Sequence, residues 1–295
     1  MSDPELDRYV AELRAAARQR AADKPAGPEL FDVADLHVPG DPGDPDVPVR
    51  LYRPVEEPRE LLVYFHGGGW TIGDLATHDR LCRRIAAGAD VAVLAVDYRR
   101  APEHPWPAAL DDAVQVVRWA QDHAKQLCGA QRIAVGGDSA GGAVATLTCL
   151  LLRDAGDRMP WAQVLVCPNT DLTFSRPSVR TKATGWGLTA ADALWFAEQW
   201  VPDPSLRAHP RVSPLLEPDL AGLPQAVVLT AEHDPLRDEG DDYATALAAA
   251  GVPVVHRCEP GLVHGFLGLD TVSPAAAAAG ERYFADVRAL LSASA

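Results

Sequence analysis

One stretch of this sequence decides the fold, and it reads Arg132-Ile133-Ala134-Val135-Gly136-Gly137-Asp138-Ser139-Ala140-Gly141-Gly142. It opens with a short apolar run at 132–135, which predicts a strand, and passes into a helical pattern at 140–153. Between them lies the pattern G-x-S-x-G, in which a serine occupies a sharp turn from strand to helix. Small flanking residues let the chain pass closely through such a turn. The sequence therefore predicts that the hydroxyl of Ser139 is exposed at a strand end.

The same alternation of strand and helix extends along the chain on both sides of this turn. Apolar runs occur at 61–65, 91–96, 132–135, 162–167, 226–230 and 254–256, and helical patterns occur at 77–89, 107–124, 140–153, 238–250 and 274–291. Strands that are apolar throughout and separated by helices predict an α/β fold with a mostly parallel central sheet, covered by helices on both faces. Such sheets bind ligands at the carboxyl ends of their strands. We therefore expect the functional site at that edge.

Two segments depart from the alternation and predict a helical cap over the carboxyl edge. Residues 4–23 carry apolar side chains at helical spacing, and a Pro/Gly/Asp-rich stretch at 39–48 separates them from a strand at 49–52. Residues 172–215 contain no apolar strand and are too long for a simple connection. We expect one domain over residues 1–295, with a cap formed by about 1–40 and about 172–215.

Composition and charge argue against several classes of function. The 295 residues are 47% apolar and carry a formal net charge of −14, and a diffuse acidic surface repels nucleic acid. The five cysteines form no C-x-x-C pair, and no cluster has zinc spacing, so no metal is expected. The N-terminus does not resemble a signal peptide, and no apolar run could span a membrane. We therefore expect a cytoplasmic protein without stable membrane insertion.

A glycine cluster directly follows the apolar run at 61–65. It reads His66-Gly67-Gly68-Gly69-Trp70. Three consecutive glycines are costly in backbone entropy and are useful where bare N–H groups must face a ligand. An oxyanion hole, which stabilises the negative oxygen of a tetrahedral intermediate, needs such donors. A phosphate-binding loop is a weaker alternative, because no Gly-Lys-Ser/Thr sequence follows.

Two further polar motifs follow the last predicted strands. They read Glu232-His233-Asp234-Pro235-Leu236 and Val263-His264-Gly265-Phe266. A serine nucleophile needs a neutral imidazole within reach, and that imidazole needs a carboxylate that orients it. Ser139, Asp234 and His264 occur in the chain order expected after a G-x-S-x-G turn. Glu232 and Asp238 are the alternatives for the acid.

Taken together, these motifs resemble the hormone-sensitive-lipase-like esterases, also called the bacterial family IV or GDXG lipolytic enzymes. The segment Asp97–Pro105 and the residues Trp186 and Leu188-Thr189 are also similar to that family. The resemblance implies the α/β-hydrolase fold and a catalytic triad of Ser139, Asp234 and His264. It further implies an oxyanion hole made by the backbone N–H groups of Gly68, Gly69 and Ala140.

The resemblance also implies an activity and several structural roles. The activity is that of a serine carboxylesterase, which hydrolyses short- to medium-chain acyl esters through an acyl-enzyme and needs no cofactor. His66 is expected to hold the glycine loop rather than act as the base, and Asp138 and Glu103 are expected to be structural. Arg100 stands where many relatives carry an apolar or polar residue, and it is assigned no function.

Aromatic residues are the candidates for lining a substrate pocket, although large rings are as often buried in the core. These candidates are Trp70, Phe174, Trp186, Trp195 and Phe266.

Three alternatives to ester hydrolysis follow from the same residues. The triad would also remove an acetyl group from nitrogen or oxygen in a small molecule, and nothing in the sequence separates amide from ester. A receptor role is disfavoured because all three triad residues are present. A dinucleotide-dependent oxidoreductase is disfavoured because no G-x-G-x-x-G follows the first parallel strand. Many relatives form dimers, so a homodimer is a further hypothesis.

Overall fold

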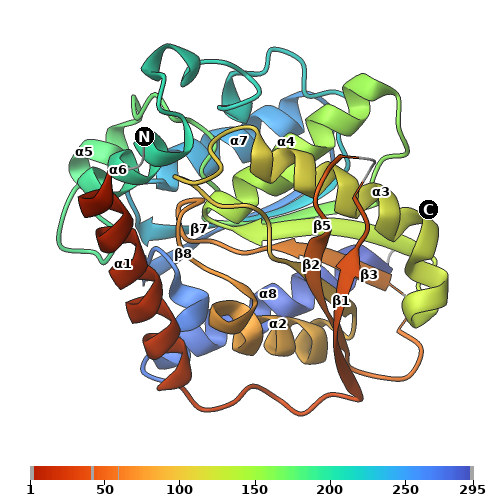
Figure 1. Cartoon of the computed structure of the whole chain (residues 1–295). Helices are drawn as coiled ribbons and strands as arrows, with labels where there is room; N and C mark the ends of the chain where they lie inside the picture. Colours follow the sequence, from red (N-terminus) through yellow and green to blue (C-terminus); the bar gives the residue numbers. More distant parts are fainter. Residues whose placement is uncertain (1–2, 41–42, 59, 293–295) are drawn as a thin grey trace.

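An eight-stranded sheet lies at the centre of the computed structural model, which describes residues 3–40, 43–58 and 60–292 (Figure 1). The strand order is β1-β2-β4-β3-β5-β6-β7-β8. The strands are β1 (Asp32–Val38), β2 (Val47–Arg53), β3 (Glu60–Phe65), β4 (Ala92–Val96), β5 (Arg132–Asp138), β6 (Ala162–Val166), β7 (Gln225–His233) and β8 (Val254–Val263). Strand β2 is antiparallel to both β1 and β4, whereas the pairings from β4 to β8 are parallel. The expected α/β-hydrolase fold with a mostly parallel sheet is confirmed.

Helices cover both faces of this sheet. They are α1 (Pro4–Ala22), α2 (Leu75–Ala89), α3 (Ala108–Cys128), α4 (Ala140–Ala155), α5 (Pro177–Thr181), α6 (Ala190–Trp200), α7 (Arg237–Ala249) and α8 (Pro274–Ser292), with short 3₁₀ turns at Pro204–Leu206, Pro214–Leu216 and Phe266–Gly268. Helices α3, α4 and α7 pack on one face, and α2 and α8 pack on the other (Figure 1).

Strand β3 illustrates why the central strands are apolar throughout. Leu61, Val63 and Phe65 belong to the core under α3 and α4, whereas Leu62 and Tyr64 belong to the core under α2 and α8. Side chains alternate between the two faces of a strand, so a strand covered on both faces buries every residue. All six residues of β3 are accordingly buried.

The strands deliver the three predicted triad residues to one edge of the sheet. Ser139 directly follows β5, and Asp234 directly follows β7. Strand β8 extends to Val263, well beyond the apolar run at 254–256, because it continues to pair with β7 past an irregularity between Ala231 and His233. His264 is therefore the first residue after β8.

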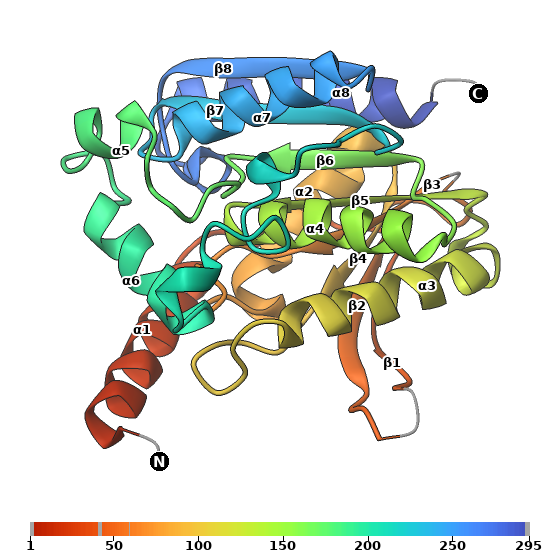
Figure 2. The ribbon, with the colours of Figure 1, turned by 90° about the horizontal axis from the view of Figure 1, so that it is seen from above.

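Helices α1, α5 and α6 gather at the same end of the molecule, although α1 is far from the other two in sequence (Figure 2). The N-terminal boundary expected for the cap needs correction. Residues 32–38 form strand β1, at the edge of the sheet, and are not part of a helical cap.

Within the described part of the chain, no helix combines the length and the apolar character needed to cross a membrane.

Candidate active site

Ser139 lies on a strained turn between β5 and α4. Its φ of 55° and ψ of −121° are unusual for a residue with a side chain. Its backbone N–H donates to the carbonyl of Val166 at 2.8 Å, which holds the turn against β6. A Cβ on Gly141 would lie 1.9 Å from the carbonyl oxygen of Phe65, so only glycine fits there. The glycines of the G-x-S-x-G motif thus allow the close approach that the serine position requires.

The imidazole of His264 bridges Ser139 and Asp234. Its Nε2 lies 2.9 Å from Oγ of Ser139, and its Nδ1 lies 2.7 Å from Oδ2 of Asp234. The other oxygen of Asp234 accepts the backbone N–H of Leu236 at 2.9 Å, and the carboxylate is fully buried. Both carboxylate oxygens are therefore held, so the Asp234 side chain has one defined orientation toward the imidazole.

Two opposing effects set the pKa of His264. Burial favours the neutral ring and lowers the pKa, whereas the charge of Asp234 and its hydrogen bond raise it, and the net result is a pKa above the ordinary 6.5. The two alternative acids lie elsewhere. Glu232 accepts the N–H of Gly261 at 2.7 Å, and Asp238 accepts the N–H of Ser178 at 2.8 Å.

A cysteine lies beside these residues and bears on whether they could hold a metal ion. Donor atoms of Cys167, Asp234 and His264 all lie within 4.8 Å of one another. Burial, followed by the nearby charge of Asp234, raises the pKa of the Cys167 thiol well above its usual value. Zinc-binding cysteines are thiolates, whereas this thiol stays protonated and the Nδ1 of His264 already faces Asp234. The group is poorly suited to a metal.

The glycine loop after β3 lies next to Ser139. Gly68 and Gly69 have φ values of 117° and 58°, which side chains rarely adopt. Among the described residues, the N–H groups of Gly68 and Gly69 donate no hydrogen bond. Ala140 is the first residue of α4, where the helix offers its N–H no partner. The loop and the helix thus place unpaired donors beside the serine hydroxyl.

Asp138 fastens this loop to the serine turn. Its Oδ1 accepts the N–H of Gly67 at 3.1 Å and the hydroxyl of Tyr64 at 2.9 Å. His66 supports the loop from the other side, where Nδ1 contacts the carbonyl of Gly67 at 2.9 Å and the ring stacks on Tyr98 at 4.2 Å. Burial and the neighbouring His78 lower the pKa of His66 to about 3, so its ring is neutral.

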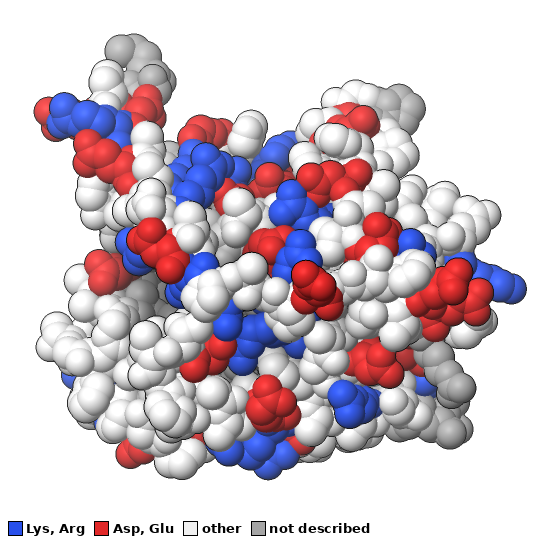
Figure 3. Space-filling view, turned by 90° about the horizontal axis from the view of Figure 1, so that it is seen from below, with Lys and Arg blue, Asp and Glu red and all other residues white. Residues whose placement is uncertain are grey.

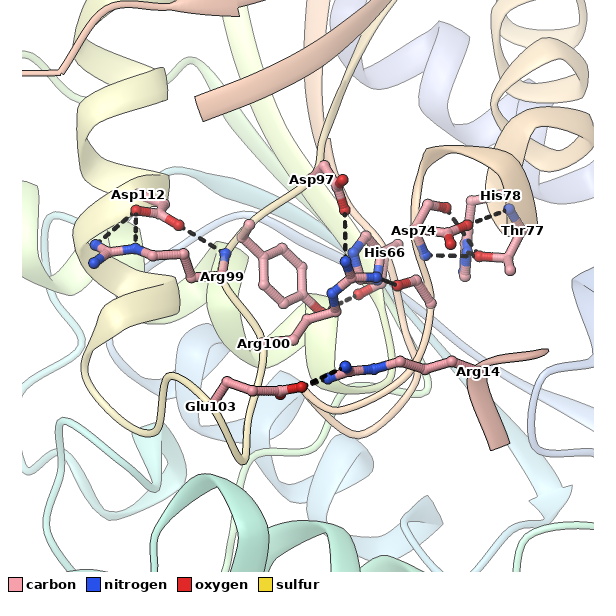
Figure 4. A network of polar contacts seen from close by, with 12 residues as sticks. Arg14, His66, Asp74, Thr77, His78, Asp97, Arg99, Arg100, Glu103 and Asp112 are labelled. Atoms are coloured by element: carbon pink, nitrogen blue, oxygen red, sulfur yellow. Dashed lines mark hydrogen bonds and ion pairs between the residues drawn. The ribbon is translucent and has the colours of Figure 1, made fainter. Parts of the chain in front are cut away.

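Charged residues tie the outer side of the loop to α1 (Figure 4). The guanidinium of Arg14 forms two hydrogen bonds with Glu103, at 2.6 and 2.8 Å, and a third with the carbonyl of Thr71 at 2.9 Å. Arg100, to which the sequence assigned no function, donates to the carbonyl of Gly73. Helix α1 is thereby anchored to the segment that follows the three glycines.

Two cavities meet at Ser139 and His264. An apolar cavity of about 260 Å³ is lined by the glycine loop and by residues of the 172–215 segment and α1; the latter are Ala17, Leu188, Ala193 and Phe196. A charged cavity of about 360 Å³ runs beside α2 and the end of α1, and Lys24, Arg80 and Arg84 contribute to its wall.

The five aromatic candidates differ in where the structure places them. Trp70 lines the apolar cavity and stacks on Trp200 at 4.2 Å. Trp186 instead stacks on His233, Trp195 contacts Tyr9, and Phe174 and Phe266 pack against the core. These four do not line either cavity at Ser139.

The sequence analysis missed Phe196, which lines the apolar cavity and comes closest to Gly69: a Cβ there would lie 2.2 Å from the Phe196 ring. The signal that could have found it was its place in the aromatic stretch Trp195-Phe196 of a predicted cap.

Comparison with known proteins agrees with this geometry. The family described as the α/β hydrolase fold matches residues 62–268. The carboxylic ester hydrolase LipN of Mycobacterium tuberculosis is 46% identical over 275 residues, which cover 90% of this chain and 73% of that protein. The carboxylesterase NlhH of the same organism is 41% identical over 299 residues, which cover 97% and 94%.

A solved structure supports the same assignment. It is that of the ester-hydrolase EH1AB1 from the metagenome of Lake Arreo, complexed with a derivative of bipyridine phosphonate. It superposes with a TM-score of 0.90 at 39% identity, covering 96% of this chain and 91% of that one. This chain therefore belongs to the α/β-hydrolase family, within its hormone-sensitive-lipase-like carboxylic ester hydrolases.

Proposed function

We propose that this carboxylic ester hydrolase cleaves short- to medium-chain acyl esters, with Ser139 as the nucleophile, His264 as the base and Asp234 as the acid that orients it. One observation carries the proposal. A continuous chain of hydrogen bonds, of 2.9 and 2.7 Å, joins Ser139 to His264 and His264 to Asp234. The chain begins at a hydroxyl that faces two cavities and adjoins unpaired backbone donors. A serine nucleophile needs an adjacent base, and the base needs an acid that orients it; Ser139, His264 and Asp234 are arranged in this way.

In the mechanism that follows, His264 takes the proton of Ser139 as its oxygen attacks the ester carbonyl. The N–H groups of Gly68, Gly69 and Ala140 stabilise the negative oxygen of the tetrahedral intermediate. His264 then passes its proton to the leaving alcohol, and an acyl-enzyme remains. A water molecule activated by the same imidazole hydrolyses it.

The size of the apolar cavity supports the preference for short and medium acyl chains. Its volume of about 260 Å³ is below the range of pockets that enclose drug-sized ligands, roughly 300–1,000 Å³. Phe196 and Trp70 are among its lining residues. A long acyl chain would therefore have to extend beyond it.

We further propose that α1 and residues 172–215 act as the cap over this site. Ala17 of α1 and Leu188, Ala193 and Phe196 of the second segment all line the apolar cavity, which supports the assignment. The five free cysteines suit the reducing cytoplasm, which is the location we propose. The homodimer stays a prediction.

The test compares the wild type with Ser139→Ala on p-nitrophenyl acetate, butyrate, octanoate and palmitate. We expect turnover of the shorter esters, reduced by about 10⁴-fold or more in the variant. Thermal unfolding monitored by circular dichroism checks that the variant is folded. Wild-type rates in a folded Ser139→Ala protein would overturn the mechanism, and a preference for palmitate would overturn the chain-length proposal.

A further inference from the structure

The charged cavity beside Ser139 has a cationic wall that the mechanism above does not use. Lys24, just beyond α1, and Arg80 and Arg84 of α2 line it together with Ser139 and His264. Arg84 is buried, and Lys24 and Arg80 are partly buried. Positive charge that is partly removed from water is costly unless it is paired. Whether this cavity favours an anionic ligand therefore depends on which of its cations are already paired with nearby carboxylates.

One carboxylate serves both arginines of this wall. Asp270 accepts two hydrogen bonds from Arg80, at 2.6 and 2.7 Å, and lies 3.2 Å from Arg84. Asp79 also lines the cavity, but its oxygens accept hydrogen bonds from Arg83 at 2.7 Å and from the hydroxyl of Tyr52 at 3.0 Å.

The remaining acid in the wall is Asp138, which lies next to Ser139. It accepts hydrogen bonds from the N–H of Gly67 and the hydroxyl of Tyr64, and its other oxygen lies 3.5 Å from Nε2 of His78, so its negative charge stays at the serine side of the cavity. Arg80 and Arg84 share Asp270, whereas no carboxylate among the described residues forms an ion pair with Lys24.

Lys24 is the cation with donors to spare. Among the described residues, its ammonium donates one hydrogen bond, to the carbonyl of Gly268 at 2.9 Å. An ammonium has three donors, so two remain for a ligand. Burial, followed by the charge of Arg80, lowers the pKa of Lys24, and the charge of Asp270 offsets only part of this.

The chain as a whole is acidic, so a cation inside the cavity stands out from its surroundings. The whole chain has a net charge of −14. On the face seen from below in Figure 3, Lys and Arg lie among Asp and Glu, without an extended area of one sign. Attraction of an anion would therefore arise locally, inside the cavity.

We propose that the charged cavity binds a carboxylate on one arm of the substrate, so that the enzyme acts on esters with one neutral and one acidic arm. This rests on the ester hydrolysis proposed above. The neutral arm occupies the apolar cavity, and the two free N–H groups of Lys24 hold the carboxylate. Charge-assisted hydrogen bonds of this kind are stronger than neutral ones.

The test uses matched neutral and acidic esters. The pairs are p-nitrophenyl butyrate against mono-p-nitrophenyl glutarate, with the acid on the acyl arm, and ethyl butyrate against butyryloxyacetate, with the acid on the alcohol arm. In Lys24→Met, KM for at least one acidic ester should rise about ten-fold or more with kcat little changed, whereas the neutral esters are unaffected. Lys24→Arg, which keeps the positive charge, should show a KM for the acidic esters close to that of the wild type. Lys125→Met, which removes an exposed charge elsewhere, should change nothing.

A binding measurement separates this inference from the proposed function. Calorimetry of monomethyl glutarate with the Ser139→Ala protein reports on the cavity without turnover. Binding that is lost in the Ser139→Ala/Lys24→Met protein supports the carboxylate site even if the esters tested are poor substrates. Undetectable binding together with equal KM values for neutral and acidic esters overturns it. An equal loss on both kinds of ester in Lys24→Met would show a merely structural lysine, and would also overturn it.

Discussion

The sheet side and the cap side of this site are held in different ways. On the sheet side, Ser139, Asp234 and His264 each follow a strand end directly, and their positions depend on the register of buried strands. On the cap side, α1 is anchored by ion pairs such as Arg14 with Glu103 and by surface contacts. We therefore expect residues on the sheet side to determine the rate of the chemical step, and residues on the cap side to determine which substrates bind. Changes on the sheet side should therefore reduce kcat most.

The largest effect in this comparison is expected for Asp234→Asn. Loss of the carboxylate favours the wrong tautomer of His264 and leaves an imidazolium without its counter-charge, so kcat should fall by about 10⁴-fold. The measurement is kcat and KM on p-nitrophenyl butyrate. Glu232→Gln serves as the control, because that acid contacts Gly261 instead of the imidazole. A loss of less than ten-fold in Asp234→Asn would contradict the assignment of the acid.

The pH profile of the same variant gives a second readout. The base must be neutral, so kcat/KM of the wild type should rise with pH through a pKa above 6.5, since Asp234 stabilises the charged ring. Without that carboxylate, the charged ring loses its stabilisation and the acid limb should move to lower pH. An unchanged acid limb would mean that another group controls it.

An intermediate effect is expected for Gly69→Ala, where the two sides touch. The φ of 58° and the clash of the new Cβ with Phe196 should displace the N–H donor and lower kcat by about 10²-fold. Gly156→Ala is the matched control, since its φ is 73° and its Cβ would meet nothing within 4 Å. The double variant Gly69→Ala/Phe196→Ala sharpens the comparison. Recovery of kcat would assign the loss to the cap, and no recovery would assign it to the loop backbone.

The smallest effect is expected for Arg14→Met on the cap side. Arg14→Met removes the partly exposed ion pair with Glu103 and the hydrogen bond to the carbonyl of Thr71, so it should cost about 1–2 kcal/mol of stability and change kcat little. Relative KM values for acetate and octanoate esters should shift more than kcat. The control is Arg8→Met, an exposed position on the same helix. A fall in kcat as large as that of Gly69→Ala would show that the cap side also takes part in the chemistry.

This division also explains what the sequence could predict. The strands and the residues directly after them were legible, because buried strands are apolar and polar motifs interrupt them. Strand β1 was not, because it lies at the sheet edge, alternates weakly and carries Asp32 and Asp35. On α6, Trp195 and Phe196 are adjacent and so point in different directions. Which of the two faces the cavity depends on tertiary packing. The same holds for Trp186, whose ring stacks on His233 instead of lining the cavity.

Helix α1 offers a practical route to altered selectivity. Ala17 lines the apolar cavity and Ala21 lines the charged one, and the two lie one turn apart on the same helical face. Both side chains are small, so larger or charged replacements would protrude into one compartment or the other. A combinatorial library restricted to these two codons would vary both arms of the ester at once and leave the hydrolytic machinery intact.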